Sequence, residues 1–320
     1  MASFAGVVVV NKDKGYTSHD VVAILKRLYK EKAGHSGTLD PNATGVLPVC
    51  LGKATKFAEL FLSDNKSYVA EVILGVTTDT GDVTGEILKG DGVFVHPDVS
   101  EKPKSSKAHG ENPQVRELSQ LQNLNFSAQD VRNALESFKG EYMQTPPMYS
   151  AIKIGGKKLY ELARKGETVE RKPRPVEIFD IKLLEFYKNG FTISVDCSKG
   201  TYIRALCADI GEKLGCGATM GDLRRTKSGN FCIEDSVTIE EIKNCGNAWD
   251  LATPIEKLLP YPAAVLKPAA YNSAKSGNPV KLANLSHIDT AAPKHWLQAE
   301  DKTIGLFTLK NNALICEVML

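Results

Sequence analysis

The sequence of 320 residues contains no apolar run near the roughly 18 residues that a membrane-spanning helix needs. Its seven cysteines are scattered without a C-x-x-C pair, and its N-terminus has neither a basic start nor a cleavage-site pattern. This combination predicts reduced thiols in a cytoplasmic protein. The six histidines show no H-E-x-x-H or similar spacing, and no glycine-rich nucleotide loop occurs, so the sequence predicts neither a metal site nor a cofactor.

The net charge is only +2, which does not by itself indicate a nucleic-acid binder. Basic residues are nevertheless concentrated between positions 150 and 174, where eight of them stand against three acidic residues. Such a run is compatible with contacts to a phosphate backbone. Taken alone, it is at least as compatible with a solvated charged face.

Apolar periodicity and turn residues predict an α+β protein. Residues 7–10 are typical of a buried strand, and residues 17–20 offer N-caps for a helix with Val21, Leu25 and Leu28 on one face. Residues 33–45 are expected to be a loop, since three glycines and a proline interrupt any regular pattern. Further strands are expected at 46–51, 68–76, 178–187 and 191–197, and helices at 54–62, 159–165 and 202–214. Another helix is expected to begin at Ser127, which forms a capping-box pattern with Asp130.

The domain organisation is suggested by prolines at positions 254, 260, 262 and 268, which are typical of a linker. We expect residues 1–255 to form one domain, with a mixed or antiparallel sheet and flanking helices. Residues 262–320 are expected to form a small β-rich module. Residues 96–120, rich in Lys, Ser, Glu and Asn, are predicted to be a flexible surface insertion in the first domain.

One loop, residues 34–45 with the sequence GHSGTLDPNATG, carries the most distinctive chemistry. Its glycines permit tight or left-handed backbone, and Pro41 biases Asp40 toward an extended conformation. A carboxylate fixed in this way between core elements suits nucleophilic work. On these residues alone, however, an ordinary Asp-Pro turn is the better interpretation.

The loop resembles the signature G-H-[ST]-G-x-L-D-P-x-A-x-G of the TruB-type pseudouridine synthases, and residues 46–56 continue the resemblance to their bacterial branch. Further blocks match in the family's order, at 66–68, 77–82, 146–158, 197–204 and 223–226. The resemblance therefore covers about residues 1–245, and the insertion at 96–120 is a departure from compact bacterial members. The module at 262–320 resembles the RNA-binding PUA domain, mainly by position, size and residues 266–280.

The resemblance implies an isomerase that converts uridine to pseudouridine without a cofactor, in the T-arm of tRNA at the T-loop position expected to be 55. Asp40 would be the carboxylate that acts while the bond between N1 and C1′ breaks. Attack at C1′, addition to the base and a glycal route are all compatible with this residue. Arg204 would pair with Asp40, and Tyr68 would stack on the target base and assist removal of the C5 proton.

The same resemblance implies that His35, Tyr202 and Leu223 contact the substrate or line the uracil pocket, although each residue alone would be read as packing. The uridine lies in a folded arm, so the enzyme is expected to flip it out. The partner would be tRNA, with no membrane and no obligatory protein partner, and the protein would act as a monomer. Candidates for RNA phosphate contacts are Lys157, Lys158, Arg164, Lys165, Arg171 and Arg174.

Two alternative functions share these motifs. One is an RNA-binding module whose catalytic loop is idle, against which the intact Asp40, Tyr68 and Arg204 argue. The other is a pseudouridylase that depends on a guide RNA. Such proteins usually carry long basic tails and a divergent segment after the aspartate, and this sequence shows neither.

Overall fold

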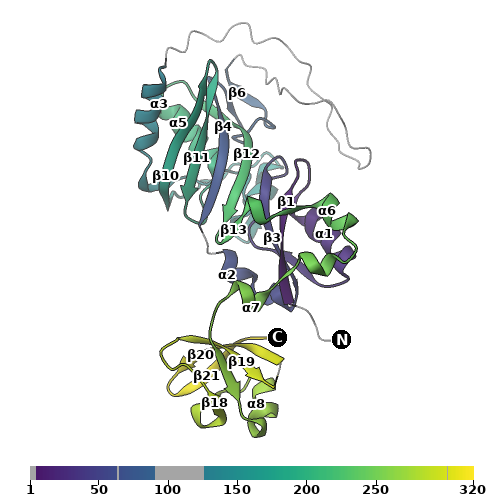
Figure 1. The fold of residues 1–320 in the computed structure, drawn as a ribbon. Helices are drawn as coiled ribbons and strands as arrows, with labels where there is room; N and C mark the ends of the chain where they lie inside the picture. The colour runs from purple at the N-terminus through teal and green to yellow at the C-terminus, as the bar shows by residue number, and fades with distance from the viewer. Residues whose placement is uncertain (1–4, 63–64, 91–125, 301) are drawn as a thin grey trace. The chain divides into compact units, whose positions relative to one another are not determined.

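A computed structural model describes residues 5–62, 65–90, 126–300 and 302–320 (Figure 1). The predicted insertion at 96–120 lies outside these residues. The chain divides into two compact units, the first made of residues 1–64 and 225–320 and the second of residues 65–224. The first unit is therefore discontinuous in sequence. The predicted division near residues 255–262 falls inside it and stays a prediction.

The first unit is built on the predicted valine strand. β1 (Ala5–Lys12) pairs antiparallel with β3 (Thr44–Gly52), in a register that runs from Ala5 opposite Gly52 to Lys12 opposite Gly45. The short β2 (Ala33–His35) pairs with β3, and two-residue strands flank β1, namely β14 (Val237–Thr238) in parallel and β15 (Thr253–Pro254) antiparallel. Strand β2 lies within the segment predicted to be a loop, because three residues are too few to show a strand's alternation.

Helix α1 (Ser18–Tyr29) begins where the capping residues predicted it. The Thr17 side chain accepts a hydrogen bond from the backbone N–H of Asp20, and the Asp20 carboxylate accepts one from the N–H of Thr17, which completes a capping box. Val21, Leu25 and Tyr29 are buried at a spacing of four residues. Leu28, predicted to face inward, is 39% exposed, because it lies one position beside this stripe.

The other elements of the first unit outside its C-terminal module are short, and several of them contact β1 or β3. They are η1 (Lys53–Phe57), α2 (Ala58–Leu62), β13 (Phe231–Cys232), η2 (Ile233–Asp235), α6 (Ile239–Asn244), η3 (Ala248–Leu251) and α7 (Ile255–Leu258). Residues 54–62, expected to form one helix, are thus a 3-10 turn followed by a single α-helical turn.

The C-terminal residues form the predicted β-rich module. Its six strands lie in the order β17-β21-β20-β19-β16-β18, with β16 parallel to β19 and the other neighbours antiparallel. Phe307, Leu297 and Leu314 are fully buried in its core. The elements are β16 (Ala263–Leu266), η4 (Pro268–Ala270), α8 (Tyr271–Lys275), β17 (Val280–Lys281), η5 (Leu282–Asn284), β18 (Leu285–His287), β19 (Lys294–Ala299), β20 (Lys302–Lys310) and β21 (Ala313–Met319).

This module shares a core with the N-terminal strands. Trp296 and Leu306 belong to the same buried cluster as Val7 and Phe57, and the rings of Phe57 and Trp296 lie 5.6 Å apart. The Trp296 indole N–H also donates to the carbonyl oxygen of Leu259 at 2.8 Å. An apolar core with a satisfied indole fixes the module to this part of the unit.

The second unit contains an antiparallel sheet in the order β4-β11-β10-β7 (Figure 1). Helices α3 (Ala128–Glu136) and α5 (Ile203–Lys213) lie on one face of this sheet, and α3 begins with the predicted capping box of Ser127 and Asp130. The strands are β4 (Lys66–Leu74), β7 (Gly140–Gln144), β10 (Arg174–Tyr187) and β11 (Gly190–Cys197). Smaller elements are β5 (Thr77–Thr78), β6 (Ile87–Lys89), β8 (Lys153–Ile154), β9 (Lys157–Lys158) and α4 (Leu159–Ala163).

The chain returns from the second unit to the first along β12 (Ala218–Ser228). Mixed sheets with helices on their faces and a β-rich C-terminal module confirm the predicted α+β class. None of the helices in the described segments combines the length and the apolar character required to cross a membrane.

Candidate active site

Backbone hydrogen bonds hold the loop that carries Asp40 at its turn. The N–H of Ala43 donates to the carbonyl oxygen of Asp40 at 3.1 Å, and the N–H of Gly15 donates to that of Pro41 at 2.8 Å. Gly45 ends the loop with a φ of +101°, and a Cβ at this position would lie 2.1 Å from the carbonyl oxygen of Arg225. Only glycine fits there, because both the backbone conformation and the close approach exclude a side chain.

Two buried side chains, Lys12 and Ser18, hold the loop around Asp40 through hydrogen bonds to its backbone. The Ser18 hydroxyl accepts from the N–H of Leu39 at 2.9 Å and lies 3.1 Å from the carbonyl oxygen of the same residue. The Lys12 ammonium donates to the carbonyl oxygens of Asp13, Tyr16 and Pro41 at 2.9, 2.7 and 3.1 Å. Residues on both sides of Asp40 are therefore tied to the first strand and the first helix.

Arg225 is the third buried side chain that holds this loop, and it is 1% exposed. Its guanidinium donates to the carbonyl oxygens of Val46 at 2.7 Å, Gly37 at 3.1 Å and Thr38 at 3.4 Å. The planar fork of an arginine suits such divergent acceptors. One side chain thus links the start of the loop to the strand that follows it.

Burial affects the ionisation of two side chains near the loop. It lowers the pKa of Lys12 to about 8, while the carboxylates of Asp13 and Asp40 act in the opposite direction. Burial is also the main cause that lowers the pKa of His35, and His19 and Arg225 add to it. His35 lies on β2 with its ring 5.6 Å from that of His19, and its Nδ1 has no hydrogen-bond partner in the described part of the chain. These causes favour a neutral His35.

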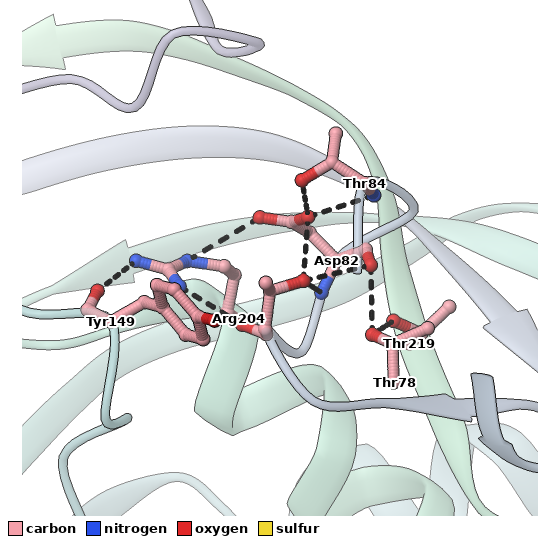
Figure 2. A network of polar contacts seen from close by, with 7 residues as sticks. Thr78, Asp82, Thr84, Tyr149, Arg204 and Thr219 are labelled. Carbon is pink, nitrogen blue, oxygen red and sulfur yellow. Dashed lines mark hydrogen bonds and ion pairs between the residues drawn. The ribbon is translucent and has the colours of Figure 1, made fainter. Parts of the chain in front are cut away.

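In the second unit, Arg204 lies in the first turn of α5 and is 6% exposed. Its guanidinium donates to the carbonyl oxygens of Thr80 at 2.9 Å and Tyr149 at 2.8 Å, and its Nε lies 3.9 Å from the Asp82 carboxylate (Figure 2). The Asp82 carboxylate in turn accepts from the Thr80 hydroxyl and from Thr84. The guanidinium is therefore oriented by several groups at once.

The other predicted pocket residues of the second unit lie on three elements. Tyr68 is half-buried on β4, opposite Val195 of β11. Leu223 is 8% exposed on β12. Tyr202 is the residue that precedes α5, and its backbone N–H donates to the Gln144 side chain at 2.8 Å.

The predicted site residues are thus divided between the two units. His35 and Asp40 belong to the first unit, and Tyr68, Tyr202, Arg204 and Leu223 belong to the second. The pairing of Arg204 with Asp40 stays a prediction. Across the described ranges, no group of three or more His, Cys, Asp or Glu side chains is arranged to hold a metal ion.

The structure adds residues for which the sequence predicts no role in the site. Lys12 follows the strand predicted at residues 7–10, and Ser18 is predicted only as a possible N-cap, because nothing in the pattern distinguishes a buried polar side chain from a solvated one. Arg225 and Asp82 lie inside blocks that carry the family resemblance, so that resemblance was the signal available for them. Gln144 precedes the block at 146–158 and had no signal of its own.

The basic candidates for phosphate contacts lie on β9 (Lys157 and Lys158), in the turn after α4 (Arg164 and Lys165), and just before or at the start of β10 (Arg171 and Arg174). The Lys158 ammonium and the Arg164 guanidinium each lie 5.4 Å from the centre of the Tyr160 ring, so both cations contact one aromatic side chain. Arg171 donates to the carbonyl oxygen of Pro146 at 3.1 Å and so also has a structural contact. Lys157, Lys165 and Arg174 are exposed.

Solved structures share this fold. The chain matches, over 98% of its length, a chain of the crystal structure of the archaeal box H/ACA sRNP Nop10-Cbf5 complex, with a TM-score of 0.62, 25% identity and 85% of that chain covered. A chain of a Cbf5-Nop10-Gar1 complex gives a TM-score of 0.62 and 26% identity, over 98% of this chain and 84% of that one. The protein therefore has the fold of the pseudouridine synthases.

Sequence comparison gives the family within this class. The model of the TruB family pseudouridylate synthase N-terminal domain matches residues 26–115 and 99–203, and that of the tRNA pseudouridylate synthase B C-terminal domain matches residues 204–270. The tRNA pseudouridine synthase B of Alkaliphilus oremlandii is 44% identical over 83% of this chain and 79% of its own length. That of Clostridium tetani is 42% identical over 94% of both chains. The chain belongs to the TruB family of pseudouridylate synthases and is an enzyme of the isomerase class.

Proposed function

We propose that this enzyme isomerises one uridine in the T-arm of tRNA, at the T-loop position expected to be 55, with Asp40 as the acting carboxylate. The observation that carries the proposal is the 42% identity with the tRNA pseudouridine synthase B of Clostridium tetani over 94% of both chains. Identity with the chains from box H/ACA complexes is only 25–26%. The difference favours an enzyme that needs neither a guide RNA nor a protein partner and works in the cytoplasm as a monomer.

The reaction exchanges one bond for another within the same nucleotide. The bond between N1 and C1′ breaks, the uracil turns, a bond forms between C5 and C1′, the C5 proton leaves, and N1 gains a proton. No electrons or groups are exchanged with a cofactor. The protein therefore has to orient a carboxylate and hold a loose base, and both tasks depend on positioning.

The backbone around Asp40 supports such a role. Lys12, Ser18 and Arg225 bind the loop on both sides of this residue, so that the carboxylate is carried by a fixed turn. A charged group held in place before the substrate arrives needs no reorganisation during the reaction. The arrangement is more specific than an ordinary Asp-Pro turn requires.

Arg204 is proposed to pair with Asp40 and to orient its carboxylate. A guanidinium carries several N–H donors in a planar arrangement that matches the oxygens of a carboxylate. The fixed geometry of Arg204 supports this role, since two carbonyl oxygens and Asp82 already orient it. Tyr68, Tyr202, Leu223 and His35 are proposed to enclose the flipped-out uracil.

The cost of flipping the base is a few kcal/mol, which contacts to the pocket and to RNA phosphates have to offset. Lys157, Lys158, Arg164, Lys165, Arg171 and Arg174 are proposed to supply part of the phosphate contacts. Tyr160, whose ring both Lys158 and Arg164 approach, adds an aromatic side chain to this basic surface, as RNA-binding surfaces often do.

The test is Asp40→Asn, assayed by tritium release from C5-labelled uridine in a tRNA transcript and by tRNA binding. Turnover should be lost while binding stays nearly unchanged, because phosphate contacts dominate affinity. Turnover of the variant within about tenfold of the wild-type rate would reject Asp40 as the acting group, since loss of a nucleophile costs far more.

The same assay separates the two alternatives. An RNA-binding module with an idle loop would bind the transcript and release no tritium. A guide-dependent enzyme would release tritium only after a guide RNA and partner proteins are added. Release by the isolated protein from unmodified tRNA excludes both.

A further inference from the structure

The buried side-chain amide of Gln144 makes two hydrogen bonds to the backbone of one residue of the proposed uracil pocket. Gln144 ends β7 and is 1% exposed. Its Oε1 accepts from the N–H of Tyr202 at 2.8 Å, and its Nε2 donates to the carbonyl oxygen of Tyr202 at 3.1 Å. A primary amide carries a donor and an acceptor side by side, and so it matches both polar groups of one peptide residue.

The residue that Gln144 holds is the one from which α5 starts. Tyr202 has an extended backbone and no side-chain cap, and its carbonyl oxygen also accepts the first helical hydrogen bond, from Leu206 at 3.0 Å. Arg204 follows two residues later in the first turn. Any rotation of the helix start would therefore move both the Tyr202 ring and the Arg204 guanidinium.

The segment that begins at Gln144 also holds Arg204 directly. Five residues further on, the carbonyl oxygen of Tyr149 accepts from the Arg204 guanidinium at 2.8 Å. Two prolines between these points restrict the backbone, and Arg171 binds the carbonyl oxygen of Pro146. The segment thus fixes Tyr202 at one end and Arg204 at the other.

We propose that Gln144 is a positioning residue for catalysis, which sets the orientation of Tyr202 and Arg204 through its paired hydrogen bonds to the Tyr202 backbone. The proposal rests on the proposed function, in which these two residues serve the pocket and the carboxylate. Gln144 does not touch the substrate. Its effect reaches the reaction through the start of α5.

Gln144→Met tests the proposal, because it keeps the volume of the side chain and removes both hydrogen bonds. In single-turnover assays at saturating tRNA, the rate of tritium release should fall by about tenfold or more, as expected for a displacement near 1 Å in a catalytic group. The dissociation constant for tRNA should change by less than about threefold, since phosphate contacts carry the affinity. Gln129→Met on α3 is the matched control, because that glutamine is exposed and bonds only to Asn133 among the described residues.

Gln144→Glu should make the rate relative to wild type depend on pH, which a purely structural role of Gln144 would not do. A neutral glutamic acid donates and accepts and so preserves both contacts to Tyr202, whereas the ionised form loses the donor. The rate relative to wild type should therefore be nearly normal at low pH and fall as pH rises through the pKa of the new carboxyl, which burial raises. This variant also covers the case in which Gln144→Met does not fold.

The ionisable groups around this position have to be separated from the new carboxyl. They are Tyr142 on β7, whose hydroxyl contacts the Gln144 amide, Asp209 and Cys207 on α5, and Cys197 at the end of β11. Burial, with a smaller contribution from Glu212, raises the pKa of Asp209 to about 6, so this group titrates in the same window in both proteins. Repeating the comparison with Asp209→Asn in both backgrounds should leave the pH dependence of the ratio intact.

A folded Gln144→Met protein with a rate within about twofold of wild type would overturn the proposal, because ~1 Å of misplacement costs far more than twofold. So would a ratio for Gln144→Glu that does not change with pH, or a pH dependence that disappears with Asp209→Asn. Failure of the proposed function looks different. In that case Asp40→Asn would retain its turnover, or the wild-type protein would release no tritium from tRNA.

Discussion

In the loop that carries Asp40, buried side chains hold the backbone, whereas around Arg204 the backbone holds a side chain. Lys12, Ser18 and Arg225 direct their polar groups to peptide groups of the loop. In the second unit, peptide carbonyls of Thr80 and Tyr149 receive the Arg204 guanidinium. A short carboxylate has little reach of its own, so its position is that of its backbone. A long guanidinium has several rotatable bonds and has to be fixed at its end.

This difference predicts how substitutions in each region should affect stability and activity. The loop depends on three buried polar side chains, Lys12, Ser18 and Arg225, and on the core that supports β1 and β3. The Arg204 site depends on two backbone carbonyl oxygens and on one carboxylate at 3.9 Å. Substitutions that disturb the Asp40 loop should therefore lower both the stability and the activity of the protein. Substitutions that disturb the Arg204 site should lower mainly the activity.

The largest effect is expected from truncation after Tyr261, which removes the C-terminal module and exposes Phe57 and its neighbours. Because Trp296 and Leu306 belong to that shared core, the melting temperature of the first unit should fall by on the order of 10 °C. Hydrogen exchange measures the loss of protection strand by strand. Protection should drop in β1 and β3 and persist in β10 and β11, and unchanged protection in β1 would show that the module adds nothing to the loop's support.

A smaller but still large effect is expected from Arg225→Met. The substitution leaves buried carbonyl oxygens at Val46, Gly37 and Thr38 without this donor, so stability should fall by about 3 kcal/mol and turnover by more than tenfold. Urea denaturation and tritium release measure the two quantities. The exposed neighbour Arg224 provides the control for stability, since Arg224→Met should be within about 0.5 kcal/mol of wild type. Equal stability of the two variants would contradict the role of Arg225 in holding the loop.

For the second region, Asp82→Asn should reduce turnover while leaving the protein folded. The guanidinium keeps its two carbonyl partners and loses a negative charge at 3.9 Å, so we expect a decrease of roughly tenfold and a loss of stability near 1 kcal/mol. Single-turnover rates measure the loss of turnover, and denaturation midpoints measure the loss of stability. If Asp82→Asn lost as much stability as Arg225→Met, the proposed contrast between the two regions would be wrong.

The sequence predicted what local pattern encodes. The valine strand, the cap at Thr17 and the capping box at Ser127 are all present, because each depends on residues within one turn or one strand. Leu28 was misplaced because a helical stripe drawn by apolar type alone is wider than the face that is buried here. Strand β2 was missed because its three residues show no alternation.

The support of the candidate site could not be predicted from local pattern. Lys12 follows a run of valines, where a lysine normally marks the return to solvent, yet it is fully buried because three carbonyl oxygens converge on its ammonium. That convergence exists only after the loop has folded over the strand. The discontinuous first unit has the same origin, since its halves meet through β1, β3 and the strand that returns at Arg225. Asp40 itself was found by resemblance and not by physics.

The last prediction concerns Lys12, and it tests the loop side of the comparison by pH. Burial lowers the pKa of Lys12 to about 8 in the folded protein, against 10.5 for an ordinary lysine. Between these values the unfolded chain binds more protons than the folded one, so the free energy of unfolding should rise with pH in this window. Below pH 8 the burial penalty on the charged form is fully present. From pH 8 to 9.5 the free energy of unfolding of wild type should rise by roughly 1–2 kcal/mol relative to that of Lys12→Met.

The activity should respond to pH in the opposite direction, because a neutral amine has two N–H groups for three carbonyl oxygens and the loop loses one contact. Denaturation at fixed pH values measures the first quantity, single-turnover rates measure the second, and Lys26→Met on the exposed face of α1 is the control. A difference between wild type and Lys12→Met that stays flat from pH 7 to 9.5 would mean that Lys12 remains charged, held by its carbonyl partners more strongly than burial disfavours it.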